Sequence, residues 1–177
     1  MSRRLGIAAA LICATTLTAG CAPDPDPTPT PTGFTSQAEA FAAAEKTYRA
    51  YVNALNNVDL TDPATFEDVY KWETGEALAD EKKSLTGMHA DGWIMEGDTE
   101  PGIASLRDSS TTSENTVVIH VCMDVGNVSV HDASGASLVS EDRPDVQPLD
   151  VTLVASSQSA TGLVISRTAA SEETCGT

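Results

Sequence analysis

The sequence predicts an α+β domain, in which three helices precede about five or six antiparallel strands. Two observations predict it. Apolar side chains recur at helical spacing between residues 36 and 91, and after Gly92 they alternate with polar ones at strand spacing. Clusters of Gly, Ser and Asp, which favour turns, separate the later stretches.

The first helix is predicted to begin at Ser36, because Ser36 followed by Glu39 forms a capping box. Alanines keep the helix propensity of this stretch high. The helix is predicted to end near residues 56–57. Its apolar side chains at helical spacing are Phe41, Tyr48, Val52 and Leu55.

Two shorter helices follow. Asp62 with Pro63 is a cap followed by a first-turn proline, which predicts a helix running to about Trp72. The third helix is predicted to begin near residues 74–75 and to stop at residues 91–92. Its charged side chains predict a solvent-facing side, formed by Glu76, Asp80, Glu81, Lys82 and Lys83.

The strongest strand signal is residues 116–125, where apolar side chains from Val117 onward occupy every second position. The turn signal at 132–135 predicts a hairpin between 128–130 and 138–139. The remaining predicted strands are 93–95, 102–106, 149–155 and 163–167, the last two paired as a second hairpin.

This order of elements resembles the NTF2-like family, including its SnoaL and ketosteroid-isomerase relatives. The resemblance covers about residues 34–170 and depends on element order rather than on a motif. It implies that the three N-terminal helices pack on a curved antiparallel sheet, which wraps around the long first helix and leaves a cone-shaped pocket. The family contains enzymes, binding modules and accessory domains, so the fold does not select the function.

The N-terminus has the pattern of a secretory signal peptide: Arg3 and Arg4, then an apolar run of about 13 residues, then small residues before Cys21. The run is too short to span a membrane, which takes ~20 residues. Residues 17–21, Leu-Thr-Ala-Gly-Cys, resemble the lipobox of bacterial lipoproteins, with Thr18 in place of the commoner leucine. The resemblance implies cleavage before Cys21, a diacylglyceryl group on its sulfur, and acylation of the new amine. An ordinary secretory signal with an unlipidated Cys21 is the alternative.

The sequence therefore divides into a signal peptide at 1–20, a lipidated cysteine with a linker at 21–33, and one α+β domain at 34–177. Five of the nine prolines occupy every second position of the linker. Proline fixes φ and disfavours helix in the residue before it, so the linker is predicted to be extended. It would hold the domain away from the membrane.

The net charge limits the binding partners of the protein, and the cysteine content limits its disulfides. The formal net charge is −16, and loss of Arg3 and Arg4 leaves 8 basic residues against 26 acidic ones. Such a surface repels nucleic acid, which we exclude as a partner.

Cys13 leaves with the signal and Cys21 is assigned to lipid. In an oxidising compartment the remaining pair, Cys122 and Cys175, is predicted to form a disulfide; two unpaired thiols are the alternative.

No residue pattern predicts a catalytic or metal site. His89, His120 and His131 lack metal-ligand spacing. His120, Cys122 and Asp124 share one strand face and would suggest a nucleophile, but the predicted disulfide uses Cys122. That face is opposite the apolar one, so we expect His120 outside, away from any pocket. The acidic loop 141–145 lacks the ordered ligands of a calcium loop, so we expect a solvated turn.

A pocket enzyme would need a carboxylate or histidine base in an apolar cavity, and the inward strand positions are aliphatic, so we assign none. Aromatic side chains could instead line a cone or fill the core; they are Tyr48, Tyr51, Phe66, Trp72 and Trp93.

We therefore expect a non-catalytic lipoprotein of the cell envelope, without metal or cofactor. It would be displayed on the outer face of a bacterial, by composition actinobacterial, membrane, and would bind a protein partner or a small apolar ligand. Exposed Trp72 or Trp93 would favour a protein partner and a cavity would favour a ligand. One alternative is a SnoaL-like isomerase, dehydratase or hydrolase, with an acid or histidine buried beside a tyrosine. The other is a purely structural role, with a filled core.

Overall fold

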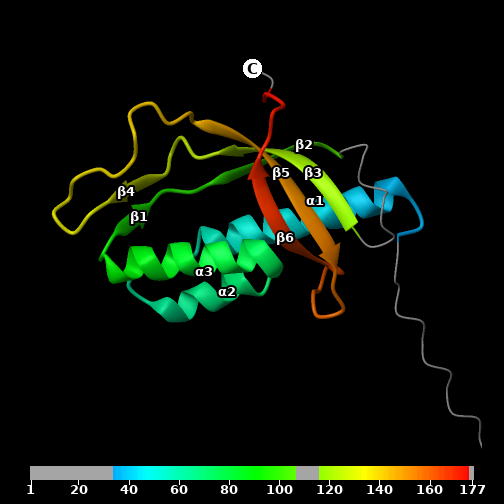
Figure 1. The fold of residues 1–177 in the computed structure, drawn as a ribbon, viewed down its shortest axis with the longest axis horizontal. Helices are drawn as coiled ribbons and strands as arrows, with labels where there is room; N and C mark the ends of the chain where they lie inside the picture. Colours follow the sequence, from blue (N-terminus) through cyan, green and yellow to red (C-terminus); the bar gives the residue numbers. More distant parts are fainter. Residues whose placement is uncertain (1–33, 107–115, 176–177) are drawn as a thin grey trace, which may run out of the picture.

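The computed structural model describes residues 34–106 and 116–175. The predictions about the signal peptide, Cys21 and the linker lie outside these residues. Within them the fold is α+β, with helices packed on antiparallel sheets, as predicted (Figure 1).

The helices begin and end close to the predicted positions. Helix α1 spans Gln37–Leu55, and the Ser36 hydroxyl accepts a hydrogen bond from the Glu39 N–H at 3.2 Å. The predicted second helix is a 3-10 turn, η1 (Pro63–Phe66), continued by α2 (Glu67–Tyr70). The Asp62 carboxylate caps this turn by accepting from the Ala64 N–H. Helix α3 spans Gly75–Ala90.

Four strands form the main antiparallel sheet, in the order β2-β3-β5-β6. Strands β5 and β6 are longer than the sequence pattern predicts. The four strands are β2 (Glu100–Leu106), β3 (Thr116–Asp124), β5 (Val146–Ala155) and β6 (Leu163–Ala170). Helix α1 lies across one face of this sheet, with contacts to β2, β3 and β6.

Two short strands, β1 (Ile94–Glu96) and β4 (Ser129–His131), pair with each other in a second sheet. They continue the antiparallel β2–β3 pair beyond a bend. The predicted hairpin from 128–130 to 138–139 forms only in part, because 138–139 is not a strand. The turn forms, with the Gly135 N–H bonded to the Asp132 carbonyl, and it is followed by an isolated bridge between His131 and Ser137 and by a hydrogen bond from the Leu138 N–H to the Val130 carbonyl at 2.8 Å. The main partner of β4 is β1, because the bent ribbon brings β1 beside it.

The core has two clusters that meet along α1. The first joins α1 to the sheet through Tyr48, Val52, Ile119 and Leu153, all 1% exposed or less. The second joins the end of α1 to the other helices and is built from Ala54, Leu60, Phe66, Val69 and Leu85.

The chain after α2 attaches to the edge of the main sheet. The Ile165 N–H donates to the Trp72 carbonyl and the Thr74 N–H donates to the Ile165 carbonyl, both at 2.8 Å. Glu73 makes the corresponding parallel bridge with Ile165. This contact fixes Glu73 beside the inner face of the sheet.

Candidate functional site

A cavity of about 400 Å³ lies between the helices and the inner face of the sheet. Its wall is mostly apolar, with a group of carboxyl and hydroxyl groups set into it. The lining residues are Tyr48, Tyr51 and Leu55 of α1, Glu73, Ala77, Asp80, Glu81, Ser84, Leu85 and Met88 of α3 and the turn before it, and Met95, Met123, Leu149 and Thr168 of the strands.

Glu73 is the most unusual of these residues. Its side chain is 8% exposed, and the carboxyl oxygen Oε2 is buried without a hydrogen-bond partner. Burial raises the pKa of Glu73 to about 8, and the charge of Glu81 adds to this. A buried acid that holds its proton near neutral pH can both donate and accept a hydrogen bond.

Glu81 and Tyr51 form a hydrogen-bonded pair in the same wall. The Tyr51 hydroxyl donates to Glu81 Oε2 at 3.0 Å. Burial raises the pKa of Glu81, and the Tyr51 hydroxyl partly opposes that rise. Burial and the neighbouring charges of Glu81 and Glu73 raise the pKa of Tyr51 well above its usual value, so the phenol remains a donor.

Tyr48 is 1% exposed, and its buried hydroxyl has no hydrogen-bond partner. Burial raises the pKa of Tyr48, so this phenol is also neutral. Its ring lies against that of Tyr51, with centroids 6.1 Å apart. The cavity thus holds two unsatisfied polar groups, one on α1 and one on the turn before α3.

The acids were missed in the sequence because they come from a helix and a turn, not from strands. Glu81 was predicted to face solvent, and this was wrong. It lies one helical turn from Ala77 and one from Leu85, both buried. This i, i+4, i+8 stripe places Glu81 on the buried face of α3. Glu73 lies four residues before Ala77. This spacing of four residues was the sequence signal that could have identified both acids.

The predicted aromatic residues separate into two groups. Tyr48 and Tyr51 line the cavity. Phe66, Trp72 and Trp93 belong to the second core cluster, where Phe66 is 2% exposed and both tryptophans are partly buried. Their rings do not line the cavity.

Cys122 of β3 is joined to Cys175 by a disulfide, with the two Cα atoms 5.8 Å apart. His120 lies beside it, with Nε2 3.9 Å from the Cys122 sulfur and Nδ1 3.3 Å from an Asp150 carboxylate oxygen. His120 lies away from the cavity, as expected, but it is not on the surface, since it is 3% exposed. It lies under the disulfide, on the sheet face opposite the cavity.

In the part of the chain that the structure describes, only His120 and the two cysteines are close enough to hold a metal, and the disulfide uses both sulfurs. His89 is structural: its Nδ1 lies 2.7 Å from the Leu60 carbonyl oxygen. His131 sits on β4, opposite Ile94.

The acidic loop at 141–145 is fastened to the bend by Arg143. The guanidinium of Arg143 donates to the carbonyls of Val125 and Val128 at 2.7 and 2.9 Å. The Val125 N–H donates in turn to the Asp145 carbonyl at 2.7 Å. The loop therefore has a structural role at the bend.

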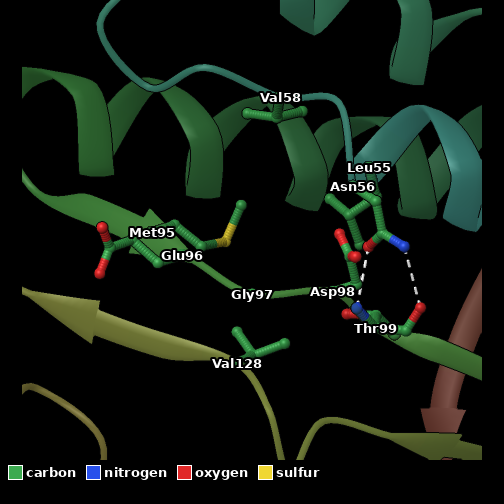
Figure 2. Close-up of a pocket in the computed structure, with 9 residues that line it drawn as sticks. All are labelled: Leu55, Asn56, Val58, Met95, Glu96, Gly97, Asp98, Thr99 and Val128. Atoms are coloured by element: carbon green, nitrogen blue, oxygen red, sulfur yellow. Dashed lines mark hydrogen bonds between the residues drawn. The ribbon is translucent and has the colours of Figure 1, made fainter.

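A smaller cavity of about 150 Å³ lies where α1 ends beside the bend between β1 and β2 (Figure 2). Leu55, Val58, Met95 and Val128 supply its apolar wall. The Asn56 side chain on its rim is bonded to the backbone of Thr99, so its amide is already satisfied. The larger cavity, with unsatisfied groups, is the better candidate site.

No family model matches the sequence, and no curated protein matches it. The structure is similar to the intermembrane space region of the chloroplast protein ARC6, with a TM-score of 0.53 at 12% identity, over 73% of this chain and 94% of that one. It also aligns with a periplasmic fragment of TraM (TM-score 0.43, 10% identity, 76% and 96% covered) and with Agrobacterium tumefaciens VirB8 (0.41, 12%, 82% and 100%). Of these three matches, only the one to ARC6 has a TM-score above 0.5. Because its sequence identity is 12%, it shows a similar fold and nothing more.

The helices of residues 34–106 and 116–175 include none that is long and apolar enough to cross a membrane.

Proposed function

We propose that this protein is a lipid-anchored, extracytoplasmic binding module with an NTF2-like cone, which takes a small, largely apolar ligand into the cavity beside Glu73. The cavity carries the proposal. Its volume of about 400 Å³ falls in the range of ligand pockets, roughly 300–1,000 Å³, and an apolar wall with a few convergent polar groups is typical of them.

The cavity also separates the ligand hypothesis from the others. Trp72 and Trp93 are partly buried against the second core cluster, so they supply no exposed aromatic patch for a protein partner. A purely structural role predicts a filled core, whereas this one leaves a cavity with an unpartnered carboxyl oxygen. Binding of a small molecule accounts for both observations.

The test of binding is native mass spectrometry of the protein extracted from its own membrane. We expect a small extra mass, bound one to one, that survives desalting. Ser84→Phe fills the mouth of the cavity from an exposed position and should abolish that mass. Ala79→Phe, exposed on the same helix but outside the cavity, is the matched control. Protein and lipid alone would contradict the proposal.

The location of the protein is tested separately. Cleavage at the lipobox and lipid on Cys21 would hold the domain on the outer face of an actinobacterial membrane. Cys21→Ala should then move the protein from the membrane to the medium. Continued retention of the variant in the membrane would contradict the anchor without affecting the cavity.

A second candidate function, a SnoaL-like enzyme, is favoured by one observation. Glu73, with its pKa raised to about 8, lies in an apolar cavity with Tyr48 and Tyr51, a combination suited to general acid–base chemistry. If the protein is an enzyme, wild type should convert its bound molecule into a product, detected by a change of mass or, for an isomerisation, by a change of chromatographic retention, and Glu73→Gln should leave the molecule unchanged. A ligand that is released intact from both supports the binding module.

A further inference from the structure

The backbone of Glu73 is fixed at the wall of the cavity. Its backbone is bridged to Ile165, and the residues on either side are hydrogen-bonded to the same strand. The side chain is 8% exposed and Oε2 has no partner in the folded chain. A buried carboxyl oxygen without a partner is an unfilled hydrogen-bonding group.

Glu81 does not fill that role, because its Oε2 already accepts the Tyr51 hydroxyl at 3.0 Å. Tyr48 also lines the cavity, and its buried hydroxyl is the second group without a partner. A ligand that satisfies both must offer a donor to Glu73 and a group that can bond to a phenol. An ammonium with several N–H donors can do both.

The charge around the cavity favours a cation. Three of its lining residues are acids, Glu73, Asp80 and Glu81, and none of the described lining residues is a lysine, arginine or histidine. A carboxylate or phosphate ligand would therefore meet repulsion. The negative charge of these acids would instead attract a cation.

The composition of the walls favours an organic cation over an inorganic one. Met88, Met95 and Met123 supply polarizable thioethers, and Tyr48 and Tyr51 supply aromatic rings. An inorganic cation would need a shell of oxygen ligands, whereas most of this surface is apolar. A cavity of about 400 Å³ leaves room for a hydrocarbon body beside the charged group.

We propose that the cavity selects a protonated organic amine, with an apolar body among the methionines and its ammonium paired with the Glu73 carboxylate and the Tyr48 hydroxyl. This inference rests on the proposed ligand-binding function. The titratable groups around Glu73 are Asp80 and Glu81 of α3, Tyr48 and Tyr51 of α1, and Tyr70 of α2. Because Glu73 holds its proton near neutral pH in the empty cavity, pairing should release that proton.

The experiment is calorimetric titration of the lipidated protein in phosphatidylcholine nanodiscs with matched probes. The pairs are hexylamine and hexanol, octylamine and octanol, and 1-adamantylmethylamine and 1-adamantylmethanol, with empty nanodiscs as the partition background. At pH 7 we expect at least one amine to bind tenfold or more tightly than its alcohol. The same amine titration, repeated in two buffers of different ionisation enthalpy, should show that close to one proton is released for each amine bound.

Glu73→Gln should lower the amine affinity at least tenfold, leave the alcohol within about twofold, and abolish proton release. Glu100→Gln removes one charge from an exposed strand position and should change none of these values. Equal affinity for amine and alcohol would overturn the inference and leave the binding function standing. Failure of every pair to bind would overturn both. If Glu73→Gln does not fold, amine binding by the wild type without proton release overturns the pairing.

Discussion

The side chain of Asn56 is bonded to both backbone groups of Thr99. Asn56 Nδ2 donates to the Thr99 carbonyl at 2.9 Å, and the Thr99 N–H donates to Asn56 Oδ1 at 3.0 Å (Figure 2). Asn56 directly follows α1, and Thr99 lies in the bend between β1 and β2. The end of the long helix thereby fixes where the strand ribbon bends.

Loss of this pair should be costly. Asn56→Ala leaves two groups of Thr99 unsatisfied at a residue that is 6% exposed, so we expect a loss of about 1–3 kcal/mol in the free energy of unfolding. Asn57→Ala removes an exposed bond to the Asn53 carbonyl and should cost about 0.5 kcal/mol or less. Urea denaturation of both variants measures the difference, and equal losses would contradict the role given to Asn56.

The bend also depends on Gly97. Its φ is +88°, and a Cβ there would lie 2.0 Å from the Asn127 carbonyl oxygen. Gly97→Ala should therefore destabilise the protein by about 3 kcal/mol or more, since backbone must shift as well as adopt a strained φ. Gly135 has a similar φ of +86° with nothing near its Cβ position, so Gly135→Ala should cost only about 1–2 kcal/mol. Thermal denaturation compares them; equal shifts would show that the contact with Asn127 is unimportant.

Glu73 should make stability decrease with rising pH. Its pKa is about 8 in the folded protein and close to 4.5 when exposed, so between these values the folded state binds more protons than the unfolded state. The contribution is complete below pH 4.5 and is lost as pH rises through about 8, with a slope of up to ~1.4 kcal/mol per pH unit. Glu73→Gln should flatten the profile between pH 5 and 8, measured by urea denaturation. A slope unchanged in the variant would assign the effect to other groups.

Local sequence signals predicted the helices well and the sheet pairing less well. Ser36 and Asp62 are caps that act within a few residues, so the starts of α1 and η1 are readable from short windows. The β1–β4 pair joins segments about 35 residues apart through a bend, and no local pattern encodes it. The turn at Gly135 therefore indicated the segment that only bridges β4 and not β1, the strand that pairs with it.

The candidate site was only partly predictable for a similar reason. Tyr48 and Tyr51 were visible as aromatic residues at helical spacing. Glu81 has lysines beside it in the chain, and this charge pattern is the usual sign of a solvated helix face. Its hydrogen-bond partner Tyr51 and the strand residues that share the cavity wall with it are distant in sequence.

The hydrogen bond from Tyr51 to Glu81 should stabilise the folded protein more than a buried phenol hydroxyl without a partner does. Tyr51→Phe leaves the partly buried Glu81 carboxyl group without its donor, so we expect a loss of about 1–3 kcal/mol in the free energy of unfolding. Tyr70→Phe removes a buried hydroxyl that has no partner and should change stability by about 0.5 kcal/mol or less. Guanidinium denaturation of the pair tests this. A cost for Tyr70→Phe equal to that for Tyr51→Phe would refute a specific hydrogen bond.

The disulfide should stabilise the domain by restricting the unfolded chain. Cys122 and Cys175 are separated by 53 residues, for which the chain-entropy model gives about 4 kcal/mol. The double variant Cys122→Ser, Cys175→Ser should lose most of this in denaturant titrations. It should also release the tail that covers His120, which would become reactive toward diethyl pyrocarbonate. Thiol labelling of the unreduced wild type is the control, and labels on both cysteines would show that the bond does not form in the native protein.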